Sequence, residues 1–516
     1  MTNAILRGKP DAGNPHVRFD EGEVASYPPT AGRPEGGRGV KPRRGGPLAY
    51  NRREFMKGAV LAACVPAVTR AFADGKTAPS AYAKALETTY DVDVFVAGGG
   101  PSGVAAAIAA ARSGAKVFLA ESTSAFGGMA TAAFVPAFAQ FGDGVNFLAD
   151  GFGREVREKG CAGSPTIYDG WVVLNPEKLK TFYDGAVQAA GVAFSFYTNV
   201  VDAVAEDGRI AYAVLASKRG LFAVRAKTYV DCTGDGDLLA FAGGKFEFGD
   251  GGNREVQPPT LCSIWSGIEF DKRTIGDQTA LPKAIADGVF SVPDLHLPGF
   301  FRNIPGVPKV GIGNVGHVFG VDSTDERSLT KAMLDARRRL PEYERYYKKY
   351  LTGYEQMQLV CTAPNLGVRE SRRFVCDYML KEEDFLRRAT FEDEIGRYAY
   401  PIDLHVAKAD AEAFKKMWKE YCEKYRYKKG ESYGIPLRSL LPVSFTNALV
   451  AGRCLGADRK MQASIRVMPG CFITGQAAGA AAALAAKAGG EVRSVPTDRI
   501  QSALKRLGAY LPNATA

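Results

Sequence analysis

The sequence predicts an α/β protein built on a Rossmann-type parallel sheet. Three observations carry this prediction. Residues 93–97 form a run of β-branched and apolar side chains, which is typical of a buried parallel strand. A glycine-rich turn follows, and then a helix made mostly of alanine that runs to about Ser113. Residues 116–120 form a second apolar strand, so strand, turn, helix and strand stand in the order of a βαβ unit.

The turn after the first strand carries the pattern G-x-G-x-x-G, at Gly98, Gly100 and Gly103. In such a turn the first glycine permits a tight bend, the second lets the backbone approach a pyrophosphate, and the third permits close helix–strand packing. The helix opens at Pro101 and Ser102, which directs its positive end at the phosphates. Glu121 follows the second strand, where an acid bonds a ribose hydroxyl. This order of elements predicts a nucleotide site and leaves FAD and NAD both open.

The 516 residues fit a globular protein of about two domains, with 46% hydrophobic and 24% charged residues. The formal net charge is +10, but most of the basic excess lies in the first 73 residues. We therefore expect no nucleic-acid partner. The cysteines after residue 73 form no Cys-x-x-Cys pair and no Cys/His cluster with ligand spacing, so no metal site is predicted.

Two segments within the first 73 residues are not expected to form part of the sheet. Residues 1–50 are rich in Gly, Pro and Arg, and we expect a disordered extension or an overextended start. Residues 51–73 resemble a twin-arginine signal peptide, because Arg52 and Arg53 precede a short apolar run and an Ala-Phe-Ala end. This predicts export to the periplasm. The alternatives are a chance arginine pair before a buried helix and a lipid anchor at Cys64.

The apolar run of that signal is too short to span a bilayer, so no transmembrane segment is predicted.

The residues after Glu121 favour FAD. Gly127-Gly128 and Met129 resemble the flavoprotein continuation, in which a second glycine pair passes close to the cofactor pyrophosphate; the alternative is an ordinary Gly-Gly turn. Residues 174–240 and 448–489 resemble further segments of the FAD-dependent oxidoreductases of the glutathione-reductase and succinate-dehydrogenase superfamily. The resemblance covers roughly residues 90–510.

This resemblance implies FAD as cofactor and a set of contact positions for it. Beyond the first turn, these positions are Val201, Thr233, Gly234, Asp235, Gly452, Arg453, Gly475 and Gln476. Many relatives carry Gly-Asp where this chain has Gly452-Arg453, so the role of that carboxylate does not carry over. Phe126–Thr131 offers no nucleophile for a covalent flavin link, and we expect noncovalent FAD.

The motifs GVRESRR, YPIDLH and IPLRSLLP match a narrower group, which is classified beside the heterodisulfide reductase A-like flavoproteins. Its iron–sulfur label should not transfer, because the cysteine pattern is absent. The resemblance implies a discontinuous FAD-binding domain at 90–245 and 431–511, which includes a β-meander. It also implies an inserted α+β substrate or cap domain at 246–430, which shows no second dinucleotide motif.

Flavin supplies the redox chemistry, so the chain must orient a substrate and manage a proton. Arg466, Arg369 and His405 are the predicted catalytic residues, because arginines clamp carboxylates and a histidine can shuttle a proton. Further candidates are Arg372, Arg373 and Tyr378. The alternatives are a structural ion-pair strand for the Arg-Glu-Ser-Arg-Arg run and a buried core histidine for His405.

The sequence as a whole predicts an exported FAD-dependent oxidoreductase. It would transfer hydride or electrons between a small organic acid, alcohol or sugar-like molecule and an unknown acceptor. The alternative is a protein with structural FAD that serves carbohydrate binding or lyase chemistry. Substrate identity and oligomeric state are not predicted.

Overall fold

The structure is a computed structural model that describes residues 86–514 except 168–169, 274–278 and 298. The side chain of Phe301 is also not described. The described residues belong to one structural unit, Thr77–Ala516. The predicted extension at 1–50 and the predicted signal peptide at 51–73 lie outside the described residues, and both stay predictions.

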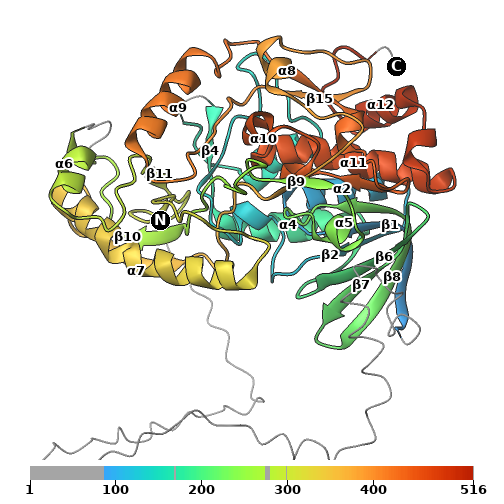
Figure 1. Ribbon diagram of the computed structural model, residues 1–516, viewed down its shortest axis with the longest axis horizontal. Coiled ribbons are helices and arrows are strands. Elements are labelled where there is room, and N and C mark those ends of the chain that lie inside the picture. The colour runs from blue at the N-terminus through green and yellow to red at the C-terminus, as the bar shows by residue number, and fades with distance from the viewer. Residues whose placement is uncertain (1–85, 168–169, 274–278, 298, 515–516) are drawn as a thin grey trace, which may run out of the picture. The chain divides into compact units, whose positions relative to one another are not determined.

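The central sheet has seven strands in the order β5-β2-β1-β8-β7-β6, with β17 beside β8 (Figure 1). The strands are β1 Thr88–Ala97, β2 Val117–Ala120, β5 Ala193–Ser195, β6 Asn199–Glu206, β7 Arg209–Ser217, β8 Gly220–Asp231 and β17 Ala448–Val450. Strands β5, β2, β1, β8 and β17 pair in parallel. Strands β6, β7 and β8 form an antiparallel meander. The predicted α/β fold with a parallel sheet is confirmed.

Two helices that pack against the parallel part of this sheet approach each other very closely. Helix α2, Pro101–Arg112, starts at the glycine-rich turn, and α11, Met468–Lys487, comes from near the end of the chain (Figure 1). A Cβ atom at Gly475 would lie 2.1 Å from the Ser102 carbonyl oxygen, and one at Gly479 would lie 2.0 Å from that of Ala106. Only glycine permits this backbone approach, which brings a late segment of the chain to the first turn.

The remaining helices of this region are short apart from α4. They are α3 Phe152–Glu155, α4 Pro176–Ala189, α5 Asp237–Phe241, α10 Arg459–Ile465 and α12 Thr497–Arg506, joined by one π-helical turn at Val156–Gly160 and 3-10 turns at η2 Gly128–Ala130, η5 Leu437–Leu440, η6 Gly452–Cys454 and η7 Val492–Ser494. Helix α4 begins where its sequence directs, because the Asn175 side chain accepts from the backbone N–H groups of Glu177 and Lys178.

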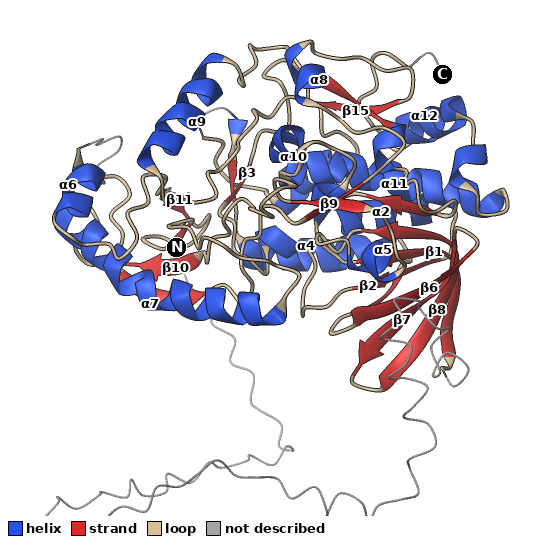
Figure 2. Cartoon of the chain, in the orientation of Figure 1, coloured by secondary structure: helices blue, strands red, loops and turns tan. Residues whose placement is uncertain are grey.

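The segment between the two parts of the central sheet has a sheet of its own. This four-stranded sheet has the order β11-β12-β10-β13, made of β11 Phe300–Asn303, β12 Gly311–Gly313, β10 Ser263–Ser266 and β13 Gln358–Thr362. The long helix α7, Glu326–Tyr350, contributes Tyr343 and Tyr347 to a separate hydrophobic cluster with Trp265. Figure 2 shows this helix beside the small sheet, away from the central one.

The other elements of the described chain are two-stranded pairs and short helices. The pairs are β3 Ala137–Phe138 with β4 Val172–Val173, β9 Phe246–Phe248 with β14 Arg372–Phe374, and β15 Glu394–Tyr398 with β16 Tyr433–Pro436; the helices are α6 Ala280–Ala286, α8 Glu382–Leu386 and α9 Ala411–Glu423. The contacts do not divide residues 77–516 further. The predicted boundaries at 245 and 430 therefore stay predictions.

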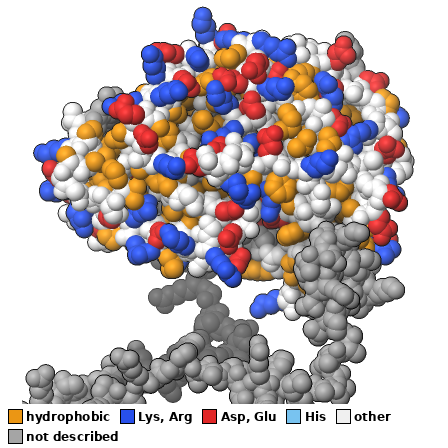
Figure 3. All heavy atoms as spheres, in the orientation of Figure 1, with side chains coloured by type: hydrophobic (Ala, Val, Ile, Leu, Met, Phe, Trp, Pro, Cys, Tyr) orange, Lys and Arg blue, Asp and Glu red, His pale blue; other side chains and the backbone are white. Residues whose placement is uncertain are grey.

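Among the described residues, no single helix has the length and hydropathy of a membrane span. Helices α10 and α11 pass that test only as a pair, bent by 93°. Basic and acidic side chains are interspersed on the face that Figure 3 draws.

Candidate functional site

The first turn has the geometry that a dinucleotide requires. Gly98 has φ +91°, and a Cβ there would lie 2.6 Å from the carbonyl oxygen of Cys232. A Cβ at Gly103 would lie 1.7 Å from the Gly98 carbonyl oxygen. At Gly100, by contrast, a Cβ would meet no atom of the described chain within 4 Å. The first and third glycines therefore serve the turn itself, and the second leaves open space at the N-terminus of α2.

Glu121 closes the turn from the end of β2. It is 6% exposed, and its Oε2 accepts from the Gly99 N–H at 2.7 Å while its Oε1 accepts from the Thr123 N–H at 2.7 Å. The carboxylate therefore ties the glycine-rich turn to the segment after the second strand. An acid at the end of this strand also lies where a ribose hydroxyl is bonded in dinucleotide sites.

The second glycine pair lies directly against the first turn. Gly127 donates its N–H to the Gly99 carbonyl at 2.9 Å, and a Cβ at Gly128 would lie 3.0 Å from the Gly100 Cα. Both glycines have positive φ, +100° and +48°. Met129, the next residue, packs partly buried against the core. The sequence placed this pair near the cofactor phosphates, and the structure brings it to the same open space.

Two further turns meet at this point; they follow neighbouring strands of the central sheet that lie far apart in the sequence. Gly234 follows β8 and Gly452 follows β17, and both have positive φ, +85° and +79°. A Cβ at Gly452 would lie 2.7 Å from Ser102 Oγ. Arg453 Nη2 donates to Asp235 Oδ1 at 2.8 Å, and the buried Arg453 Nε has no partner among the described residues. An unpaired buried N–H fits an acceptor supplied by a ligand.

The other predicted cofactor residues lie in different surroundings. Thr233 donates to Asp231, a buried residue whose pKa is raised to about 6 by burial. The Gln476 side chain accepts from the Phe152 N–H at 2.8 Å, so its oxygen is occupied by the backbone. Val201 lies in β6 with 41% of its surface exposed. Contacts of these three residues with FAD stay predictions.

Arg466 and His405, two of the predicted catalytic residues, share one acceptor. Arg466 Nη2 and the His405 backbone N–H both donate to Gln257 Oε1, at 3.3 and 3.2 Å. Arg466 Nη2 also donates to the Asp403 carbonyl at 3.1 Å, and the Asp403 carboxylate lies 3.9 Å from it. The buried Arg466 Nε has no hydrogen-bond partner among the described residues.

Arg369, the third predicted catalytic residue, belongs to the same site. Burial, and then the positive charge of Arg466, lower the pKa of Arg369 to about 10. Its guanidinium donates to the Pro258 carbonyl at 2.7 Å and to Thr260 Oγ1 at 3.1 Å, and more weakly to Asn314 Oδ1 at 3.5 Å. All three acceptors are neutral.

The other candidates from the sequence are engaged in ion pairs and hydrogen bonds of their own. Arg372 pairs with Asp237 at 2.9 Å, and Arg373 pairs with the buried Glu370 at 3.0 Å. The Tyr378 hydroxyl donates to the Asp384 carboxylate at 2.8 Å. The Arg-Glu-Ser-Arg-Arg run therefore divides: Arg369 lies in the site, and the two later arginines hold structural ion pairs.

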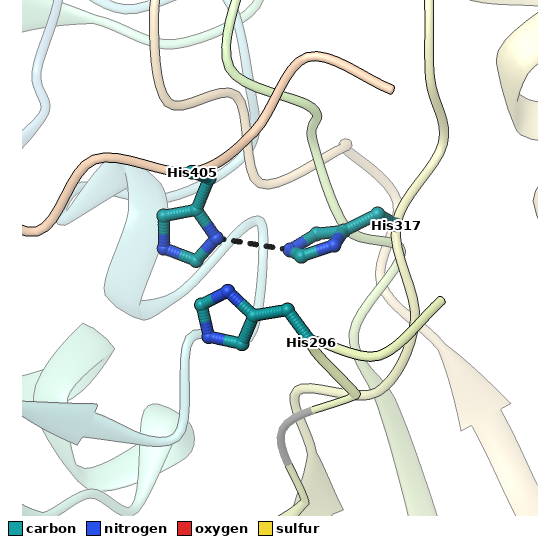
Figure 4. A group of neighbouring side chains, drawn as sticks. All are labelled: His296, His317 and His405. Carbon is teal, nitrogen blue, oxygen red and sulfur yellow. Dashed lines mark hydrogen bonds between the residues drawn. The ribbon is translucent and has the colours of Figure 1, made fainter. Parts of the chain in front are cut away.

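His405 also meets the two other histidines of the described chain, His296 and His317 (Figure 4). His405 Nδ1 lies 3.0 Å from His317 Nε2, and the His296 ring is stacked on the His405 ring with 4.3 Å between centroids. Burial lowers the pKa of all three histidines, that of His296 to about 4. Arg369 lowers the pKa of His405 further. The three imidazoles are therefore neutral at pH 7.

Carboxylates face the outer nitrogens of this cluster. Asp294 Oδ2 lies 2.9 Å from His317 Nδ1, although the angle is not that of a hydrogen bond, and Asp403 Oδ2 lies 3.5 Å from His405 Nε2. Sequence reasoning missed Asp294, His296 and His317, because they come from segments without a recognisable motif. Asp403 stood in the quoted YPIDLH motif.

A cavity of about 650 Å³ borders the site. Its wall includes Tyr400, whose hydroxyl donates to Asp403 Oδ2 at 3.1 Å. Its lining combines aromatic and basic side chains, among them Trp171, Tyr421, Arg157, Arg426, Lys428 and Lys429.

Comparison with known proteins places the chain among flavoproteins. A family model described as FAD dependent oxidoreductase matches residues 93–504. The fold is similar to that of a geranylgeranyl bacteriochlorophyll reductase-like protein from Thermoplasma acidophilum, with 13% identity, 81% of this chain and 83% of that chain covered, and a TM-score of 0.41. It is also similar to the flavin-dependent brominase Bmp2, with 14% identity, 81% and 83% covered, and a TM-score of 0.37.

A third solved structure with a similar fold is p-nitrophenol 4-monooxygenase PnpA from Pseudomonas putida DLL-E4, with 15% identity, 56% of this chain and 70% of that chain covered, and a TM-score of 0.35. At these identities and TM-scores the similarities carry no information on substrate. No curated protein sequence matches the chain significantly.

Proposed function

Because the chain belongs to the FAD dependent oxidoreductase family, whose model spans residues 93–504, we propose that it oxidises or reduces a small organic acid. Its cofactor is FAD. The acid would be held by Arg369 and Arg466, and the protein would act in the periplasm after export through a twin-arginine signal at Arg52 and Arg53. The partner that accepts or donates the electrons is not part of this proposal.

The observation that carries the proposal is a pair of largely buried guanidinium groups with too little negative charge around them. Arg369 hydrogen-bonds only neutral oxygens. Arg466 has its nearest carboxylate, that of Asp403, at 3.9 Å and one N–H without a partner in the described chain. A buried charge is costly unless it is paired and hydrogen-bonded. A carboxylate ligand would supply both the charge and the acceptors.

The acidic side chains nearby do not neutralise both arginines. Asp403 faces Arg466, His405 and Tyr400 together. Burial alone would raise the pKa of Asp403, but the facing His405 and Arg466 lower it below its ordinary value, so it is ionised. Asp294 lies against His317. The single carboxylate of Asp403 does not balance the positive charges of Arg369 and Arg466, so the site has a net positive charge.

The cavity beside the site has the same character. Four of its lining residues, Arg157, Arg426, Lys428 and Lys429, are basic, against the acids Asp143 and Glu431. Its wall at Tyr400 is in direct contact with Asp403. A basic surface near the site favours encounter with an anionic molecule.

The residues of the first turn fit FAD. The open space at Gly100 would accept a pyrophosphate, with Gly128 packed against Gly100 and Glu121 holding the neighbouring Gly99. The Asp235–Arg453 pair is a further candidate contact for the cofactor. When bound, FAD supplies the hydride chemistry. The chain positions the substrate through Arg369 and Arg466, and Gln257 holds Arg466 in place.

A proton-shuttling role for His405 stays a prediction. Both of its ring nitrogens face other side chains: Nε2 faces Asp403 and Nδ1 faces His317. Its backbone N–H holds Gln257, the residue that accepts from Arg466. These contacts support a positioning role for His405 toward Arg466.

The binding of acids to the oxidised holoprotein tests the anion site. Small mono- and dicarboxylates, each beside its neutral amide, are titrated while the flavin absorbance is followed. We expect at least one acid to perturb the flavin, its amide to have no effect, and Arg369→Met and Arg466→Met to lose the response. Arg438→Met, which removes an exposed arginine paired with Asp393, is the matched control. An amide that binds as well as its acid, or binding that both site variants retain, would overturn the proposal.

A further inference from the structure

All the histidines that the structure describes lie at one point. They come from three separate segments: His296 precedes β11, His317 follows β12, and His405 follows β15 (Figure 4). Their candidate ligand nitrogens all lie within 4.8 Å of one another. We propose that His296, His317 and His405 form a binding site for one divalent transition-metal ion of the zinc class, a site independent of the nature of the organic substrate.

The distance between two of the rings suits a shared ion. His405 Nδ1 and His317 Nε2 are 3.0 Å apart, and the two rings are nearly perpendicular, at 87°. Zinc binds imidazole nitrogen at about 2.0–2.1 Å in tetrahedral geometry, which separates two ligand nitrogens by roughly 3.3 Å. A small outward movement of the two rings would admit the ion between them.

The carboxylates around the cluster orient the rings for this role. Asp294 faces Nδ1 of His317 and Asp403 faces Nε2 of His405. A carboxylate favours the protonated form of the nitrogen that it faces, and metal-bound histidines have such partners on the nitrogen that does not bind the metal. When each ring carries its proton on the nitrogen that faces the carboxylate, His317 Nε2 and His405 Nδ1 turn two lone pairs toward each other at 3.0 Å; in the other tautomer of one ring this contact is a hydrogen bond. Two such lone pairs repel unless a cation lies between them.

Neutral imidazole is the form that binds a metal, and imidazole ligands suit zinc, copper, iron and nickel. The carboxylates of Asp294 and Asp403 offset the charge of the ion.

His296 would complete the site by moving. Its ring is stacked on that of His405, at an angle of 10°, and its buried Nδ1 has no hydrogen-bond partner in the described part of the chain. To direct the Nδ1 lone pair at the ion, the ring must tilt out of this stack. The His296 side chain is partly exposed. Three protein ligands leave a fourth position for water or for an oxygen of a ligand.

Metal titration of the tag-free holoprotein, after treatment with a chelator, tests the site without any substrate. We expect one equivalent of Zn²⁺ to bind, and Co²⁺ to bind in its place with a visible spectrum typical of nitrogen ligands. His317→Ala and His405→Ala should abolish this binding. Asp294→Asn, which keeps the ligands but removes their orienting charge, should weaken it about 10- to 100-fold. A double variant of the exposed cysteines, Cys361→Ala and Cys422→Ala, controls for thiolate binding and should bind normally.

Bound flavin content serves as the measure of folding for each variant. If a histidine-to-alanine variant loses its flavin, His317→Gln and Asp294→Asn decide the question. Absence of stoichiometric Zn²⁺ and Co²⁺ binding by the wild-type protein would overturn the proposal, and so would binding that His317→Gln and Asp294→Asn leave unchanged. These outcomes are distinguished from those of the acid titrations, because the acid titrations compare Arg369→Met and Arg466→Met and use no added metal.

Discussion

Arg453 forms an ion pair with Asp235, with 2.8 Å between Nη2 and Oδ1. The two residues follow different strands of the central sheet, β17 and β8. Asp235 lies in the turn after β8, and it also accepts from the Ser323 hydroxyl at 2.8 Å. The pair therefore joins two turns that lie far apart in the sequence.

Substitution of Gly100 by valine should yield a folded protein that binds FAD poorly. The added side chain begins in space that no atom of the described chain occupies within 4 Å, so it would collide with the pyrophosphate and not with the protein. We expect affinity for FAD to fall at least about a hundredfold, a loss of about 2.7 kcal/mol. Fluorescence titration of the apoprotein with FAD measures this loss.

Gly185→Val is the control. A Cβ at Gly185 also meets nothing within 4 Å, but this glycine lies in helix α4 and not in the glycine-rich turn. It should bind FAD normally. Full FAD affinity in Gly100→Val would place the pyrophosphate elsewhere.

Replacement of Arg466 by methionine should keep FAD and the fold but remove most of the turnover. The side-chain volume is largely retained while a charge aimed at the substrate is lost. Losing one preorganised charge contact raises the barrier by about 3 kcal/mol, roughly a hundredfold in rate. Dye reduction by the acid that binds best measures the effect, with Arg438→Met as control. Loss of bound FAD in Arg466→Met would instead assign the arginine to the cofactor.

The histidine cluster should make the metal-free protein less stable as the pH falls from 7 to 5. The unfolded histidines take up protons near pH 6.5, whereas the folded pKa of His296 is lowered to about 4. The unfolded state thus binds more protons in this window, and stability is lost as the pH falls. For His296 alone the loss is about 2 kcal/mol.

Urea unfolding of the wild type and of His296→Gln at several pH values measures this pH-dependent loss of stability. The variant should show a shallower decline between pH 7 and pH 5. Equal slopes in the two proteins would mean that His296 is not held neutral in the folded state.

The predicted signal makes export dependent on one arginine pair. Changing Arg52 and Arg53 together to lysine should leave the precursor in the cytoplasm. The same change at Arg43 and Arg44, a second pair with no apolar run directly after it, should leave export intact. Cell fractionation and immunoblotting follow the protein, and periplasmic accumulation of the Arg52/Arg53 variant would contradict the signal.

The sequence predicts best those elements whose conformation depends on residues close to each other in the chain. The glycine-rich turn, its helix and the second strand stand within a residue or two of their expected bounds, with α2 ending at Arg112. Here the backbone conformation of each glycine and the start of the helix at Pro101 decide the structure locally. The second glycine pair was also placed, because it follows Glu121 closely.

The candidate catalytic region was predicted only in part, because its contacts join distant segments. Arg369, Arg372 and Arg373 look alike in sequence, and only the packing decides which of them faces Arg466 and which pairs with Asp237 or Glu370. The histidine cluster has no local signature for the same reason. Its residues meet through the arrangement of the segment that carries the small sheet.

The most direct test of the organic-acid assignment is an anaerobic reaction of the holoprotein with paired substrates. Organic acids and their amides are mixed with oxidised protein, and with protein whose flavin has been reduced, and the flavin absorbance is recorded. We predict that at least one acid bleaches the oxidised flavin or restores the reduced one, while its amide does neither. An amide that reacts as fast as its acid, or reaction with neutral alcohols or sugars alone, would contradict the role of Arg369 and Arg466 as the site of a carboxylate.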